Sequence, residues 1–124
     1  GIAVKDLDSA VSVLKTAFNL EVEGIEEVPS QKVKVAFLPV GESRLELLEP
    51  TSDDSPIAKF LASRGEGFHH VAFKTENVEE ALEHAQTQGL RLIDKEPRPG
   101  AHGTKVAFIH PKSTFGVLIE LVED

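Results

Sequence analysis

An internal repeat restricts the possible folds of this chain more than any other feature. Residues 44–49 (Arg-Leu-Glu-Leu-Leu-Glu) and 118–123 (Leu-Ile-Glu-Leu-Val-Glu) share one pattern, which places Glu46 and Glu120 at an offset of 74 residues. Three further pairs of segments match at an offset of 70 or 71: 6–11 with 77–82, 19–20 with 89–90, and 35–38 with 106–109. Matches in the same order with a nearly constant offset indicate two copies of one module.

Each copy of the pattern places a glutamate inside an otherwise apolar strand. Apolar residues at successive positions predict a strand that is buried on both faces. A buried carboxylate costs several kcal/mol unless a hydrogen-bond network, a cation or a proton compensates its charge. Glu46 and Glu120 at matched positions therefore indicate a shared polar centre, and the alternative is two solvated edge-strand glutamates.

Both modules show the same expected order of one strand, one helix and three strands. In module one (about 1–50) we expect strand 2–4, a helix from 7 to 18, and strands 21–23, 32–38 and 43–49. A linker with a short helix follows at about 51–66. In module two (about 67–124) we expect strand 68–75, a helix from 77 to 88, and strands 91–94, 105–110 and 117–122. Helix-capping residues and apolar residues at helical or strand spacing support these elements.

Composition excludes several classes of function. A length of 124 residues suits one ordinary domain, and a formal net charge of −8 argues against a nucleic-acid surface. The absence of Cys excludes disulfides, thiolate nucleophiles and Cys-based metal sites, and the absence of Tyr removes phenolic acids and bases. No apolar run approaches the length of a membrane span. We therefore expect a soluble, intracellular protein that does not bind membranes.

His69 and His70 open the first strand of module two. Adjacent strand residues face opposite sides, so only one of them can share a face with a given site. Imidazole and carboxylates from several strands are a common ligand set for a divalent cation, although a lone strand histidine is more often a packed residue. Of the two we expect His70 to be the ligand, and its counterpart in module one would lie two places before Gly1.

Two loops carry further candidates. Residues 100–103 form a Gly-rich loop that could approach a ligand, and Lys112 follows a strand and could meet a phosphate. Plain solvated turns are the alternative for both. The chain contains no phosphate-binding loop, no dinucleotide fingerprint and no Ser/His/Asp elbow.

The duplicated module, with His on its first strand and Glu on its last, resembles the vicinal-oxygen-chelate superfamily. The similarity is greatest to its methylmalonyl-CoA epimerases, in segments 45–50, 54–61, 67–73, 96–100, 110–112 and 116–121. This resemblance implies an α+β fold of the glyoxalase/bleomycin-resistance type over residues 1–124. Two tandem βαβββ modules would form a curved eight-stranded mixed sheet around a metal cleft, and the protein would be a homodimer.

The resemblance also implies a divalent metal ion, most often Co²⁺ or Mn²⁺, with Zn²⁺, Ni²⁺ or Mg²⁺ as other options. Its ligands would be His70 and Glu120 from module two and Glu46 from module one. The fourth ligand of these epimerases is a histidine in an Asp-His segment just upstream of the residues that begin at Gly1. Either the sequence is truncated or the metal site is incomplete, and we expect truncation.

The implied reaction interconverts the two C2 epimers of methylmalonyl-CoA through an enolate. Glu120 would be one base, and Glu46 either the second base or only a ligand. Val35 stands where some relatives carry an acidic residue, which leaves the second base open. The coenzyme A phosphates would meet three cations: Lys112, Arg98 and Lys105. The protein would be cytoplasmic, or in the mitochondrial matrix of a eukaryote.

Three alternatives use the same fold. A glyoxalase I-like lyase would act on a glutathione adduct, but segments 96–100 and 110–112 favour the epimerase. An extradiol dioxygenase would bind Fe²⁺ and usually carries an extra His or Tyr, so the lack of Tyr disfavours it. A metal-free module that sequesters a ligand would have no reason to combine Glu46, His70 and Glu120.

Overall fold

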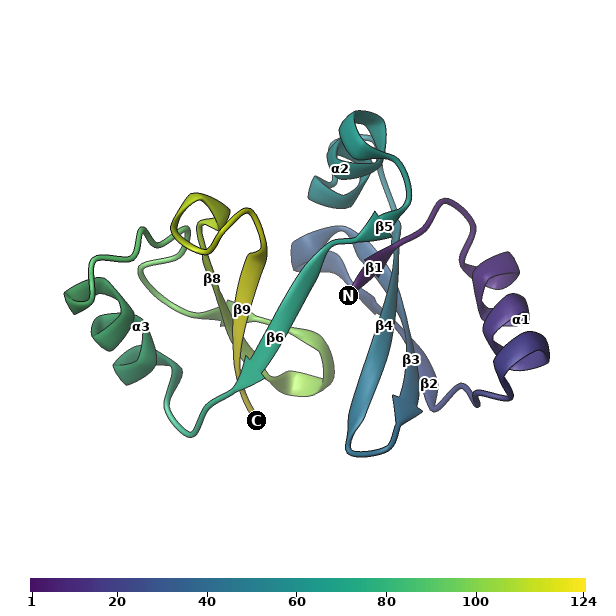
Figure 1. Cartoon of the computed structure of the whole chain (residues 1–124), viewed down its shortest axis with the longest axis horizontal. Coiled ribbons are helices and arrows are strands. Elements are labelled where there is room, and N and C mark those ends of the chain that lie inside the picture. Colours follow the sequence, from purple (N-terminus) through teal and green to yellow (C-terminus); the bar gives the residue numbers. More distant parts are fainter. The chain divides into compact units, whose positions relative to one another are not determined.

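The computed structural model describes residues 1–124, and the chain folds into two compact units, Gly1–His69 and His70–Asp124 (Figure 1). The elements of unit 1 are β1 (Ile2–Ala3), α1 (Leu7–Phe18), β2 (Gly24–Val28), a 3₁₀ turn (Pro29–Gln31), β3 (Val33–Val40), β4 (Ser43–Pro50), α2 (Pro56–Arg64) and β5 (Gly67–Phe68). Its sheet has the order β2-β3-β4-β1-β5, in which only β1 and β4 are parallel.

The core of unit 1 lies between α1 and the strands β3 and β4. Leu7, Ala36, Leu38 and Leu47 are buried there together with Val4. The helix begins at the N-cap Asp6, whose carboxylate accepts a hydrogen bond from the backbone N–H of Ser9, and it ends at Asn19 in the left-handed conformation.

The elements of unit 2 are β6 (His70–Lys74), α3 (Val78–Thr87), β7 (Arg98–Pro99), a 3₁₀ turn (Ala101–Gly103), β8 (Lys105–Ile109), a second 3₁₀ turn (Pro111–Ser113) and β9 (Leu118–Glu123). The sheet has the order β6-β9-β8-β7, and β6 runs parallel to β9. The helix α3 packs Val78 and Leu82 on Ala107, and Asn77 caps it as Asp6 caps α1.

The α+β class and the repeated order of one strand, one helix and three strands are confirmed. Two sheets of five and four strands replace the single eight-stranded sheet that we expected. The strand expected at 68–75 is divided at His69, because Gly67 and Phe68 pair with β1 whereas His70 begins the pairing with β9.

Two predicted strands are wrong. The strand expected at 21–23 is instead β2, which begins at Gly24. Its pairing with β3 runs from Gly24↔Phe37 to Val28↔Val33. Residues 91–94 form only the isolated bridge Leu92↔Ile109. There the carboxylate of Asp94 accepts a hydrogen bond from the backbone N–H of Phe108, so this N–H is not available to a backbone carbonyl of a neighbouring strand. The strand that pairs with β8 on this side is β7 instead. None of the helices has the length and apolar character needed to cross a membrane.

Candidate active site

His70 and Glu120 form the centre of the candidate site in unit 2. Their side-chain atoms Nε2 and Oε1 lie 3.8 Å apart. The parallel pairing of β6 with β9 sets Ala72 beside Glu120, so His70, two residues earlier, projects from the same face. His70 is only 4% exposed and Glu120 only 7% exposed. The structure brings these two predicted site residues together within unit 2, and their role as metal ligands stays a prediction.

Phe108 borders this pair. It stands directly opposite Glu120 across the β8–β9 ladder, and its ring meets the His70 ring edge-on with a centroid distance of 6.4 Å. The guanidinium of Arg98 lies 4.8 Å from the centre of the Phe108 ring and pairs with the carboxylate of Asp94. Asp94 and Phe108 were not predicted from the sequence, although the register of the last two strands places Phe108 beside Glu120.

Glu46 lies in unit 1, on β4, opposite Phe37. It is half-buried, so the buried-glutamate prediction holds fully for Glu120 and only partly for Glu46. The guanidinium of Arg44 lies 5.0 Å from the centre of the Phe37 ring. Val35 is 3% exposed in β3 and brings no acid–base group to unit 1.

His69 is a packed residue of unit 1. Its ring meets Phe60 edge-on at 5.1 Å, and its backbone N–H donates to the carbonyl of Gly1. Burial lowers the pKa of His69 to about 4. The imidazole is therefore neutral near pH 7.

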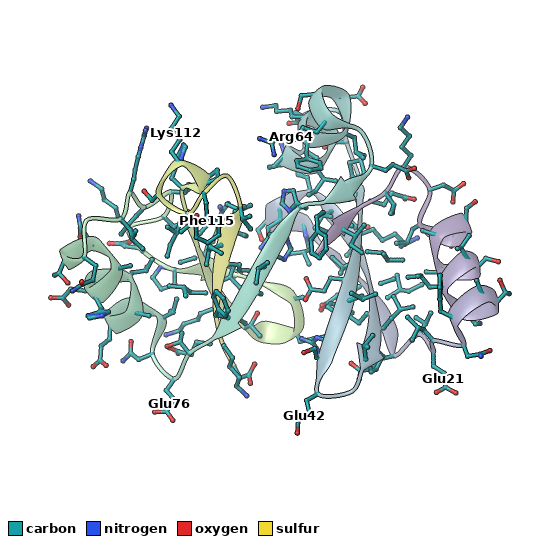
Figure 2. The ribbon with its side chains drawn as sticks, in the orientation of Figure 1. Glu21, Glu42, Arg64, Glu76, Lys112 and Phe115 are labelled. Atoms are coloured by element: carbon teal, nitrogen blue, oxygen red, sulfur yellow. The ribbon has the colours of Figure 1, made fainter.

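The three cations that we expected to meet coenzyme A lie in different places. Arg98 is on the face of the sheet that carries Phe108 and Glu120. Lys105 lies on the opposite face by strand alternation, 3.8 Å from carboxylate oxygens of both Glu79 and Glu123. Lys112 is in the loop that precedes β9, where Figure 2 shows it together with Phe115.

This loop and His70 lie at the same end of the sheet, because β9 begins at Leu118, the pairing partner of His70. Arg98 thus lies on the same face of the sheet as the His70–Glu120 pair, and Lys112 lies at the same end of the sheet as His70. Lys105 lies on the other face.

The donor chemistry of the pair fits a divalent cation. A buried imidazole and a buried carboxylate 3.8 Å apart are the nitrogen and oxygen ligands that such ions accept. No group of three or more His, Asp and Glu side chains that could hold a metal ion is present in the structure. Unit 2 therefore supplies two donors, and a metal ion would need others.

A pocket of about 880 Å³ lies elsewhere in unit 2, between α3 and residues 92–105. Leu82, Leu92 and Pro97 line it together with side chains of both charges. Neither His70 nor Glu120 lines this pocket, so the pocket is separate from the candidate active site.

The fold and the buried pair define a protein made of two βαβββ modules, with a histidine and a glutamate brought together on one sheet. The chain belongs to the Glyoxalase/Bleomycin resistance protein/Dioxygenase superfamily, whose profile matches residues 1–108, and within it to the methylmalonyl-CoA epimerases.

Two relatives and one solved structure illustrate this membership. The mitochondrial methylmalonyl-CoA epimerase of Homo sapiens is 37% identical over 121 residues, which cover 97% of this chain and 69% of that protein. The ethylmalonyl-CoA/methylmalonyl-CoA epimerase of Cereibacter sphaeroides is 36% identical over 122 residues, 97% of this chain and 91% of that protein. A methylmalonyl-CoA epimerase in complex with methylmalonyl-CoA and NH₄⁺ is 39% identical and superposes with a TM-score of 0.96, covering 100% of this chain and 90% of that one.

Proposed function

We propose that this protein is an epimerase that interconverts the (2R) and (2S) forms of methylmalonyl-CoA. The observation that carries the proposal is the buried pair of His70 and Glu120 on one face of the sheet. The epimerases among its relatives support the choice of substrate.

Glu120 is the proposed base for the proton on C2. The C–H bond breaks, an O–H bond forms on the carboxylate, and the electron pair of the C–H bond moves toward the thioester oxygen. Return of a proton to the opposite face of C2 completes the inversion. Burial of Glu120 keeps water from the reacting atoms and limits side reactions.

A divalent metal ion is part of the proposal, with His70, Glu120 and Glu46 among its ligands. When bound, the ion would supply Lewis-acid stabilisation of the negative charge that develops on oxygen. Glu46 is either a ligand or the second base, since buried Val35 cannot exchange a proton.

For the coenzyme A phosphates we propose Lys112 and Arg98. Lys105 is the weakest of the three cations, because two carboxylates lie beside it on the other face of the sheet. We further propose a homodimer, which the exposure of large apolar side chains such as Phe68 (72%) and Phe18 (65%) supports.

The test is exchange of the C2 proton of methylmalonyl-CoA with deuterium from solvent, in the presence of Co²⁺ or Mn²⁺. The experiment uses the full-length protein. We expect metal-dependent exchange that is lost in Glu120→Gln and unchanged in Glu83→Gln, which removes an exposed carboxylate from α3. Absence of exchange in folded, metal-loaded protein would overturn the proposal and favour a ligand-sequestering module.

A further inference from the structure

Asp94 holds the guanidinium of Arg98 in one place. The Nε and Nη2 atoms of Arg98 both lie 3.2 Å from Oδ2 of Asp94. The same oxygen accepts the backbone N–H of Phe108 at 2.9 Å, so the carboxylate is itself fixed by β8. The Asp94 side chain is only 17% exposed, whereas that of Arg98 is 38% exposed. Asp94 therefore connects a rigid strand to a cation that solvent and ligands can reach.

The position in which Arg98 is held is above the ring of Phe108. The guanidinium lies 4.8 Å from the ring centre, where the negative face of the aromatic ring attracts its positive charge. Phe108 is itself edge-on to His70 and opposite Glu120. A continuous series of contacts thus runs from Asp94 through Arg98 and Phe108 to the catalytic pair.

Unit 1 contains the same arrangement, built from different positions. Arg44 lies over Phe37, which stands opposite Glu46, and Nη1 of Arg44 is 3.6 Å from the carboxylate of Glu23. Arg44 comes from the strand of its own glutamate, whereas Arg98 comes from β7. In each unit, an arginine that is paired with a carboxylate lies over a phenylalanine ring. The two arginines do not occupy matched positions of the repeat, so duplication of one module does not by itself explain why both units have this arrangement.

We propose that Asp94 is a positioning residue, which fixes Arg98 on Phe108 so that the guanidinium holds an anionic group of the acyl-CoA beside His70 and Glu120. This inference rests on the proposed function. The anionic group is a carboxylate on the acyl portion or a phosphate of coenzyme A, and a planar, pre-oriented guanidinium suits both. In a chain with a net charge of −8, a fixed local cation also offsets repulsion of the anionic substrate.

The test compares Asp94→Asn, Arg98→Ala and Arg98→Lys with wild type in the full chain. Arg91→Ala is the matched control, since it removes an exposed positive charge from the same unit. Dissociation constants are measured by calorimetry for methylmalonyl-CoA and for propionyl-CoA, which lacks the acyl carboxylate but keeps the phosphates. KM and kcat are measured from the deuterium exchange.

For methylmalonyl-CoA we expect Kd and KM to rise about tenfold in Asp94→Asn and Arg98→Ala, the effect of losing one charge-assisted hydrogen bond. The value of kcat should change much less. Arg98→Lys keeps the charge but not the planar stacking, so it should fall between Arg98→Ala and wild type. Loss confined to methylmalonyl-CoA would identify the acyl carboxylate as the group held, and equal loss for both ligands would identify a phosphate.

Unchanged Kd values for both ligands in Asp94→Asn and Arg98→Ala would overturn this inference alone. A fall in kcat at constant KM would also overturn it, because that result indicates disturbed packing around Phe108 rather than loss of a contact with the substrate. Failure of the wild-type protein to bind either acyl-CoA would overturn the proposed function as well.

Discussion

The carboxylate of Glu49 accepts a hydrogen bond from the backbone N–H of Leu7 at 2.6 Å, which joins the end of β4 to the first turn of α1. Unit 2 repeats this relationship, because Glu123 on β9 accepts the backbone N–H of Val78 at 2.8 Å. The second glutamate of each repeated motif thus satisfies a helix N-terminus.

Replacement of Glu49 by Ala should lower the free energy of unfolding by about 1–2 kcal/mol, because it removes both a cap and a negative charge from the start of α1. Glu49→Gln keeps an acceptor oxygen and should cost less. Urea unfolding of both variants provides the measurement. Glu42→Ala, at the tip of the β3–β4 hairpin in Figure 2, is the control and should have almost no effect.

Gly100→Ala should destabilise the protein by about 1–3 kcal/mol, because overpacking forces the backbone or its neighbours to move. A Cβ at this position would lie 2.5 Å from Cγ1 of Val106 and 2.6 Å from Oγ1 of Thr104. Gly24→Ala is the matched control, since a Cβ there meets nothing within 4 Å. Equal melting temperatures for the two variants would contradict the predicted clash.

Stability should fall as the pH decreases from about 6.5 to about 4, and His69 is the reason. The folded state keeps this imidazole neutral down to a pKa of about 4, whereas the unfolded chain binds a proton below about 6.5. Its contribution is therefore complete above pH 6.5, is lost progressively toward pH 4, and changes no further below. Urea midpoints between pH 7.5 and 4.5 measure the effect.

His69→Phe retains a ring against Phe60 and should flatten this pH dependence. An unchanged slope in the variant would assign the effect to other groups. Asp54 does not interfere in this range, because Lys32 and then Ser52 lower its pKa to about 2. Its contribution is lost only in more acidic solution.

Phe115→Asn should raise the free energy of unfolding by up to about 1 kcal/mol, since a bulky residue in the left-handed region is strained and Asn adopts it more readily. Phe115 has a φ of 47° and is 89% exposed, so it contributes little packing that could be lost. Val13→Asn, at an exposed position of α1 with helical backbone, is the control without this gain. A loss of stability in Phe115→Asn would show that the phenyl ring makes a contact in solution, as in the proposed homodimer.

The sequence was sufficient to predict the two repeated modules and the elements that depend on local sequence patterns. The helices follow from Asp6 and Asn77 as caps and from apolar residues at helical spacing, and the glutamate motifs identify β4 and β9. The association of His70 with Glu120 was predicted from the family resemblance, because the two residues are 50 positions apart in the sequence, too far for any local pattern.

The sequence did not predict that a side chain would replace a main-chain hydrogen-bond acceptor in the sheet of unit 2. Residues 91–94 have strand composition, yet the Asp94 carboxylate takes the N–H of Phe108 and displaces the expected ladder. The same contact orders Arg98, so the failed strand and the missed positioning residue have one cause. The ion-pair partners of Lys105 were also not predictable, since Glu79 and Glu123 come from a helix and a strand distant in the sequence.

The parallel pairing of β6 with β9 has a consequence for how unit 2 is made. The strand that carries Glu120 is the last of unit 2 to leave the ribosome, yet it occupies an inner place between β6 and β8. Until it is inserted, β6 has no partner in its sheet, and His70 has no carboxylate from β9 beside it. Pairing of segments so far apart is slow because the intervening chain must first be closed into a loop. The proposed catalytic pair therefore forms only once β9 has been made, and we expect a chain that ends before β9 to lack the proposed activity.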